Sequence, residues 1–184
     1  MEFFAANRRG HEAGRPWELL RENPFNERTY GFLTSHRGDF SADDIARHVN
    51  MLYPDGLSPH GWGYMTIRFG SPLLQGGGCG LPNEPIMELI FEYVRRTDYA
   101  DRPSRLQSFF AYDSLEKAKQ EFPNTQIVRF VSEHHFRCDQ TWLNVSHQIA
   151  VAEFNAHRYW SGDASSTPEW EFLITPPFVP EIVE

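Results

Sequence analysis

The chain has 184 residues, a length that suits one domain and excludes two large ones. Hydrophobic residues make up 40% of it and aromatic residues 15%, which excludes a disordered chain because that much apolar surface can form a packed core. Lys and Arg number 17 against 25 Asp and Glu, a net charge of -8 that argues against affinity drawn mainly from neutralising phosphates. We expect one folded domain spanning residues 1–184.

The sequence gives no sign of a membrane or secretory segment. No run approaches 18 apolar residues, and the N-terminus lacks the basic-then-apolar order of a signal peptide. The two cysteines, Cys79 and Cys138, are too few for a disulfide framework or a cysteine-rich zinc site. We therefore expect a cytoplasmic protein with free thiols and no membrane association.

The first half of the chain predicts short, mixed elements, because Pro and Gly interrupt it throughout. Apolar residues recur at helical spacing after Ser41, which is a suitable N-cap, and Pro54 ends that pattern. The other expected elements are a strand Phe3–Asn7, an irregular stretch 9–26, a strand Tyr30–Ser35, a strand Trp62–Phe69 and a flexible loop 75–80.

The second half predicts alternating strands and helices. A helix is expected where Ile86, Leu89, Ile90, Tyr93 and Val94 form an apolar stripe, with acidic residues near its start and Arg95 and Arg96 at its end. Further on we expect strands Leu106–Ala111, Gln126–Val131, Glu171–Ile174 and Phe178–Val183, a helix opened by the capping pattern 113–116, and a helix from Ser146 to Gly162. The fold class is therefore α+β.

The first group of candidate site residues lies where the strand expected over Leu106–Ala111 begins. Ser and Arg side chains alternate with apolar ones in the segment 102–111. Together with Phe91–Arg95 and the helix 114–122, this segment resembles bacterial domains of the ADP-ribosyltransferase-like superfamily, whose members use NAD. The resemblance implies a split antiparallel β-sheet core flanked by helices. It also implies NAD contacts from Ser104, Arg105 and Ser108, and stacking of Phe110 on the nicotinamide.

The strand at 171–174 is similar to the catalytic strand of that superfamily. There a Glu precedes an aromatic and two aliphatic residues, so the resemblance assigns the catalytic carboxylate to Glu171, with Glu169 as the fallback. Cleavage of the bond to nicotinamide builds an oxocarbenium-like ribose, and a carboxylate beside it can bind a ribose hydroxyl and orient the nucleophile.

The opening strand is similar to the first strand of the superfamily, in which a His or Arg holds a ribose or the diphosphate. The His position reads Ala5 in this chain, which leaves Asn7 and Arg8 as the donors toward NAD.

The resemblance therefore implies an NAD-dependent ADP-ribosyltransferase that modifies a macromolecular acceptor, protein or nucleic acid, and releases nicotinamide. Small members of this kind resemble bacterial or phage toxins and defence proteins, which implies a neutralising antitoxin protein as a second partner. The acidic net charge favours a protein acceptor, whereas a basic groove built from Arg95, Arg96, Arg102 and Arg105 would receive RNA or DNA.

Other interpretations of the same residues stay open. Ala5 in place of a His favours a binding module of the same fold that has lost catalysis. His134 and His135 would centre a metal-dependent hydrolase, although adjacent side chains on an extended segment diverge. Ser104 and Ser108 are also suited to capping a turn, and Phe109 and Phe110 to core packing. For Cys79, the sequence supplies no activating base.

Overall fold

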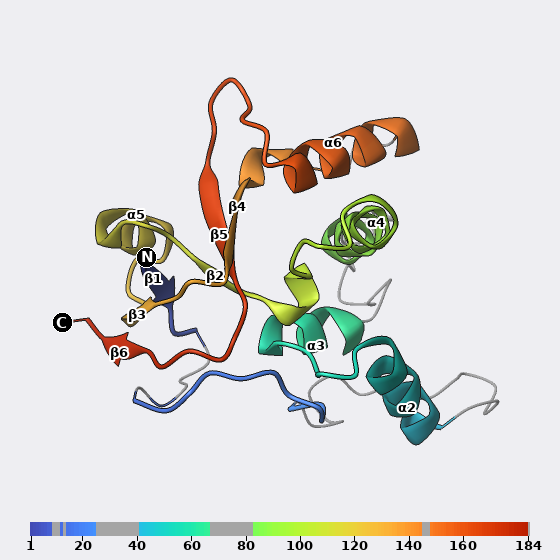
Figure 1. Ribbon diagram of the computed structural model, residues 1–184, viewed down its shortest axis with the longest axis horizontal. Helices are drawn as coiled ribbons and strands as arrows, with labels where there is room; N and C mark the ends of the chain where they lie inside the picture. The colour runs from blue at the N-terminus through green and yellow to red at the C-terminus, as the bar shows by residue number, and fades with distance from the viewer. Residues whose placement is uncertain (9–11, 13, 25–40, 67–82, 145–147, 184) are drawn as a thin grey trace, which may run out of the picture.

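The computed structural model describes residues 1–8, 12, 14–24, 41–66, 83–144 and 148–183. Within these ranges the fold is α+β, with two small antiparallel sheets and five α-helices (Figure 1). The strands are β1 (Glu2–Ala6), β2 (Phe109–Ala111), β3 (Ile127–Val131), β4 (His135–Asp139), β5 (Trp170–Ile174) and β6 (Glu181–Ile182). The helices are α2 (Ala42–Leu52), α3 (Pro59–Thr66), α4 (Asn83–Asp98), α5 (Leu115–Glu121) and α6 (Ile149–Ser161), with 3-10 turns η1 (Arg105–Gln107) and η2 (Gln140–Trp142).

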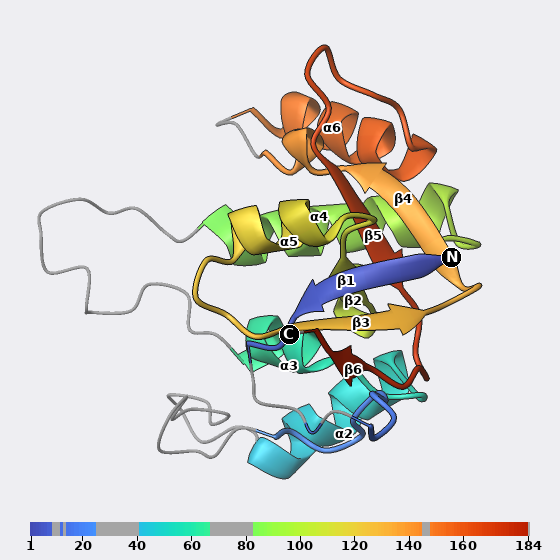
Figure 2. The same cartoon turned by 90° about the vertical axis from the view of Figure 1, so that its left-hand side faces the viewer.

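The two sheets are separate but joined at one point. One has the strand order β1-β3-β6 and the other β2-β5-β4, and all neighbouring strands are antiparallel (Figure 2). Just past the end of β2, Tyr112 exchanges two backbone hydrogen bonds of 2.8 Å with Phe4 of β1. This bridge places the start of the chain beside the β2-β5-β4 sheet.

The aromatic core fills the space between the two sheets. Phe3 and Phe130 of the first sheet pack toward Phe172 of the second, and Phe178 stacks on Phe130 with ring centroids 4.1 Å apart. Strand residues alternate between faces, so Phe172 and Ile174 enter this core while Glu171 and Leu173 point to the opposite face of β5.

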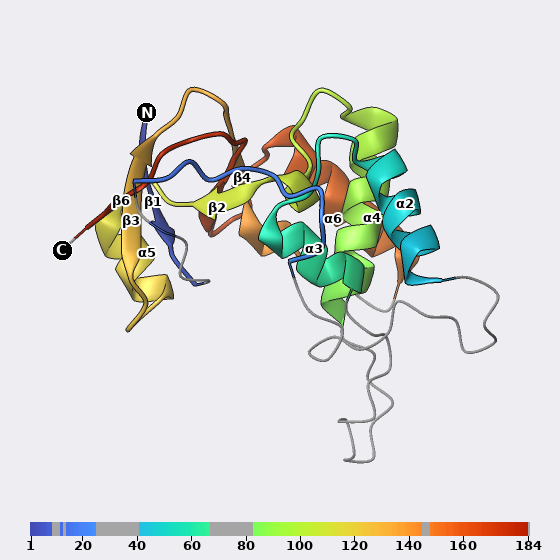
Figure 3. The ribbon, with the colours of Figure 1, turned by 90° about the horizontal axis from the view of Figure 1, so that it is seen from below.

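Helices α4 and α6 cover that opposite face. Leu173 and Cys138 of the sheet pack there against Phe91 of α4 and Trp160 of α6. Figure 3 shows α2, α3, α4 and α6 gathered at one end of the molecule, while α5 accompanies the β1-β3-β6 sheet at the other. No described helix combines the length and the apolar character needed to cross a membrane.

Several elements expected from the sequence are confirmed. Helix α2 begins after Ser41, whose side chain forms a complete capping box with Asp44. Ser114 caps α5, and α6 ends at Gly162 in the left-handed conformation with φ 76°. Strands β1, β3 and β5 lie within one residue of the expected ranges. The expected strand Tyr30–Ser35, the loop 75–80 and Ser146 fall outside the described residues.

The strand expected over Trp62–Phe69 is wrong, since residues up to Thr66 belong to helix α3 and the rest are not described. The aromatic residues suggested a strand, but Ser58 and Pro59 form a helix start: the Ser58 hydroxyl accepts from the Gly61 N–H at 3.1 Å, and Pro suits the first helical position.

Three other strand predictions also differ from the structure. Strand β4 was not expected, residues 105–107 form a 3-10 turn in place of the start of a strand, and the last strand shrinks to Glu181–Ile182.

The buried face of α4 also differs from the expected stripe. Leu89 and Tyr93 are 67% and 63% exposed, whereas Glu88 and Glu92 are only 3% and 6% exposed. The spacing of apolar residues predicts the buried face of a helix only if its glutamates face water. Here the two glutamates, one helical turn apart, turn inward because cationic partners meet them inside.

We predict that Gly61→Ala destabilises the fold by about 1–3 kcal/mol. A Cβ at this position would overlap the Leu106 carbonyl of η1, so α3 would have to move away from that turn. In an unobstructed helix the same change stabilises by about 1 kcal/mol, so the sign itself is diagnostic. Urea unfolding of the two proteins measures it, and a more stable variant would show that α3 and η1 do not pack this closely.

Candidate active site

A cavity of about 400 Å³ opens where the two sheets and α3 meet. Its walls come from distant parts of the chain, among them Ala5 of β1 and Arg8 after it, His60 of α3, Ser108 to Phe110 around β2, and Glu171 of β5. Because these segments are far apart in the sequence, the site exists only in the folded protein.

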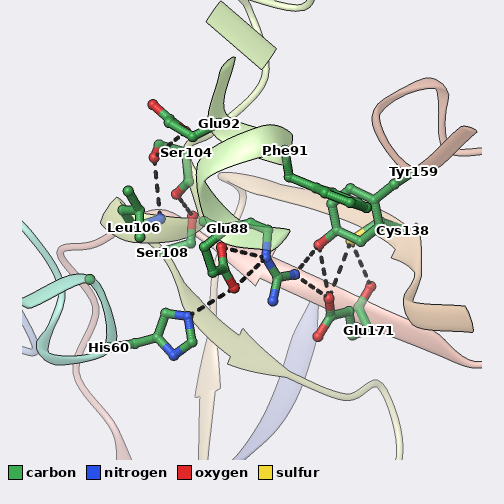
Figure 4. A network of polar contacts seen from close by, with 12 residues as sticks. His60, Glu88, Phe91, Glu92, Ser104, Leu106, Ser108, Cys138, Tyr159 and Glu171 are labelled. Atoms are coloured by element: carbon green, nitrogen blue, oxygen red, sulfur yellow. Dashed lines mark hydrogen bonds and ion pairs between the residues drawn. The ribbon is translucent and has the colours of Figure 1, made fainter. Parts of the chain in front are cut away.

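Glu171 is the carboxylate at the wall of this cavity. It stands at the helix-covered face of β5, is 5% exposed, and lies opposite Cys138 in the sheet. Its Oε1 accepts hydrogen bonds from Arg105 Nη1 at 2.6 Å and from the Tyr159 hydroxyl at 2.8 Å (Figure 4). Its Oε2 accepts none from the described residues. One oxygen is therefore fixed and the other is uncommitted.

Arg105 joins Glu171 to a second buried carboxylate. Its Nε lies 3.1 Å from both oxygens of Glu88, and its Nη1 donates to both Glu171 and the Tyr159 hydroxyl. The guanidinium is also 4.7 Å from the ring centroid of Phe110. Two carboxylates thus share one guanidinium in a setting shielded from water.

The charges of this cluster lower the pKa of Glu88 and raise that of Arg105. Burial alone would raise the pKa of Glu88, but the charge of Arg105 and the hydrogen bond from His60 outweigh it, so the pKa lies below its usual range. Burial would lower the pKa of Arg105, yet Glu88, Tyr159 and Glu171 together raise it well above its usual value. Both groups are therefore held in their charged forms.

A third buried glutamate, Glu92, fixes the turn that carries Arg105. Glu92 accepts from the Ser104 hydroxyl at 2.9 Å and from Arg95 and Arg96 at 2.8 to 3.0 Å. Burial raises the pKa of Glu92, but these hydrogen bonds and the charge of Arg95 lower it below its usual range. The basic groove expected from these arginines is therefore wrong: Arg95 and Arg96 are paired with Glu92, and Arg105 is buried.

The structure brings five of the seven expected site residues to the cavity, namely Arg8, Arg105, Ser108, Phe110 and Glu171. Asn7 and Ser104 do not line it. The Asn7 amide donates to the Gln126 side chain at 2.9 Å, and Ser104 caps η1 besides binding Glu92. Glu169 is exposed and accepts from Gln140.

Arg8 also lines the cavity. Its guanidinium lies 4.0 Å from the ring centroid of Phe122 and remains exposed to solvent. Nearby, Tyr112 also lines the cavity; burial, together with the charge of Glu171, raises the pKa of this phenol to about 12. The cavity lining thus includes both a carboxylate, Glu171, and an exposed cation, Arg8.

Three residues of the site were not anticipated from the sequence: Glu88, Tyr159 and His60. The spacing of Glu88 and Glu92 on one face of α4 was a usable signal, because charged residues beside an apolar stripe are buried only when paired. Tyr159 is fully buried within the helix expected over 146–162, but its hydroxyl contact with Glu171 depends on how α6 and β5 pack together. His60 lies in the first turn of α3, just before the segment 62–69 for which a strand was expected.

The remaining reactive residues do not form a second site. Burial and the charge of Glu171 raise the pKa of the Cys138 thiol well above its usual value, so it stays protonated. His134 and His135 are exposed, and within the described ranges no cluster of three or more His, Cys, Asp or Glu side chains could hold a metal ion. Cys79 lies outside the described residues.

Comparison with known proteins adds one finding. The model of the family described as "Protein of unknown function (DUF2441)" matches residues 82–184. This range covers more than half of the chain and contains Glu88, Arg105, Tyr159 and Glu171, whereas Arg8 and His60 precede it. No curated protein matches the sequence.

We predict that Glu88→Gln lowers the free energy of unfolding at pH 7 by about 3 kcal/mol, because it breaks a buried ion pair. The folded pKa of Glu88 lies below its usual value of 4.5, so its contribution is complete above that pH and is lost as the pH falls through the folded value.

The difference between the two proteins should therefore shrink as the pH drops below about 4.5, as urea unfolding across pH would measure. Glu153→Gln, on the exposed face of α6, is the matched control and should leave stability unchanged. A Glu88→Gln effect that is independent of pH would contradict the ionised pair.

Proposed function

Since this chain belongs to the DUF2441 family, whose description assigns no activity, we propose from the site itself that it is an NAD-dependent ADP-ribosyltransferase. It would transfer ADP-ribose to a macromolecular acceptor and release nicotinamide. The observation that carries the proposal is the arrangement of Glu171, a buried carboxylate with one oxygen fixed and the other uncommitted at a cavity wall.

This arrangement suits the chemistry of the transfer. Breaking the bond between nicotinamide and ribose builds positive charge on the ribose, and Glu88 and Glu171 together carry one more negative charge than Arg105 compensates. Because the cluster is buried, that excess charge acts through a low dielectric. The free Oε2 of Glu171 would accept a hydrogen bond from a ribose hydroxyl and orient the ring.

The other cavity residues suit the remaining parts of NAD. Phe110 would offer the nicotinamide an aromatic surface, Ser108 would lie beside the nicotinamide or its ribose, and the exposed guanidinium of Arg8 would bind the diphosphate. The volume of about 400 Å³ falls in the range of small-molecule sites. Arg105 takes a different role from the one expected: its donors serve Glu88 and Glu171, so it would position the carboxylate instead of contacting NAD.

The proposal includes two macromolecular partners. The first is the acceptor, for which the net charge of -8 favours a protein over a nucleic acid. The second is a neutralising antitoxin protein, because uncontrolled transfer of ADP-ribose to cell components would be harmful to the cell that makes the enzyme.

We predict that the protein releases nicotinamide from NAD and transfers labelled ADP-ribose to lysate components, and that Glu171→Gln lowers both rates by roughly 100-fold or more. The amide keeps the size of the side chain but removes the charge that stabilises the ribose cation. Nicotinamide release, followed by chromatography, and label incorporation measure the two reactions.

Glu169→Gln is the matched control, since Glu169 is two residues away and exposed, and it should retain activity. Thermal unfolding of Glu171→Gln separates loss of chemistry from loss of fold. Full activity in a folded Glu171→Gln protein would overturn the assignment of the carboxylate.

A second candidate is a binding module of the same fold without catalysis. Ala5 favours it, because this residue lines the cavity where the superfamily's His would stand and offers no donor to a ligand. For this candidate we predict that NAD raises the thermal unfolding temperature without nicotinamide release, and that Arg8→Ala abolishes the shift. Turnover of NAD by the wild-type protein would exclude it.

A further inference from the structure

His60 is the histidine of the cavity wall, and the function proposed above gives it no role. It lies on the first turn of α3, whose start is fixed by the Ser58 cap and Pro59. Its ring meets the Phe110 ring edge-on, with centroids 4.6 Å apart, and the Tyr64 ring at the same separation. The imidazole is therefore held between two aromatic rings and is not a mobile surface group.

Glu88 sets the orientation of this imidazole. His60 Nε2 lies 3.4 Å from Glu88 Oε1, and in Figure 4 Glu88 lies between His60 and Glu171. Arg105 keeps Glu88 ionised, and an ionised carboxylate only accepts hydrogen bonds. In neutral His60 the proton therefore resides on Nε2, which leaves the lone pair on Nδ1.

His60 lines the cavity, and its contact with Glu88 involves Nε2 and not Nδ1. No described residue donates a hydrogen bond to it, and the side chain is 29% exposed. A carboxylate that fixes one nitrogen of an imidazole while the other faces a reaction cavity is the arrangement in which histidine acts as a general base.

We propose that His60 is the general base for the acceptor, removing the proton of a hydroxyl group that attacks the ribose. The proposal rests on the proposed function and names its acceptor class: an alcohol, such as the hydroxyl of a side chain. A hydroxyl needs such a base because it is a weak nucleophile while it keeps its proton.

The step balances as follows for NAD and an alcohol. The bond between the ribose C1′ and the nicotinamide nitrogen breaks, and its electron pair neutralises the pyridinium. The alcohol oxygen forms a bond to C1′, and its proton passes to Nδ1 of His60, which later releases it to water. Glu171 serves the ribose and His60 serves the acceptor, so the two residues divide the reaction between them.

The test compares two nucleophiles with NAD as the donor: methanol, which must lose a proton, and azide, which has none to lose. His60→Ala should lose methyl ADP-ribose formation by roughly 100-fold or more while azide adduct formation is nearly unchanged. Added imidazole should restore the methanol reaction in part. His157→Gln, an exposed histidine of α6 that does not line the cavity, is the control and should behave as wild type.

The outcomes separate this inference from the proposed function. If wild-type protein turns over NAD but His60→Ala lowers both adducts equally, or neither, His60 is not the base and the proposed function stands. If wild-type protein forms neither adduct and releases no nicotinamide, the proposed function fails and this inference with it. His60→Gln, which keeps a hydrogen-bonding side chain of similar size, guards against misfolding and should show the same selective loss.

Discussion

The candidate site depends on one guanidinium. Arg105 lies between Glu88 and Glu171, and each carboxylate is buried only because this cation meets it. The ion pairs also connect three elements of the fold: Glu88 comes from α4, Arg105 from the turn before β2, and Glu171 from β5. Tyr159 of α6 completes the cluster with its hydroxyl. The position of the Glu171 carboxylate is thus set by a charge network and not by the strand alone.

Such a network has a cost as well as a use. Burying two carboxylates and one guanidinium gives up the hydration of three charges, and hydrophobic residues of the same volume would often be at least as stable. The net contribution to stability is therefore small, while the loss of any one member is severe. The network fixes the direction of one carboxylate oxygen of Glu171. It also leaves an excess negative charge beside the cavity, since two carboxylates share one guanidinium.

The sequence predicted the elements whose signals are local. The Ser41 cap, the capping pattern at 113–116 and the Gly162 stop each involve a few adjacent residues, and each is found. Signals that depend on partners failed. The buried face of α4 was misassigned because the arginines that neutralise Glu88 and Glu92 are recognised only in the fold. Aromatic content around Trp62 predicts a strand, but the helix start at Ser58 and Pro59 decides the structure there.

The backbone bridge between Phe4 and Tyr112 joins the two sheets that contribute residues to the cavity. Arg8 follows the strand on one side of this seam, and Glu171 belongs to the sheet on the other. A ligand that contacts both residues would therefore bridge the two sheets. Its contacts on each side would oppose separation of the sheets. Ligand binding in the cavity and the stability of the packing between the two sheets are coupled in this way. A ligand would therefore stabilise the whole protein and not only the residues that it contacts.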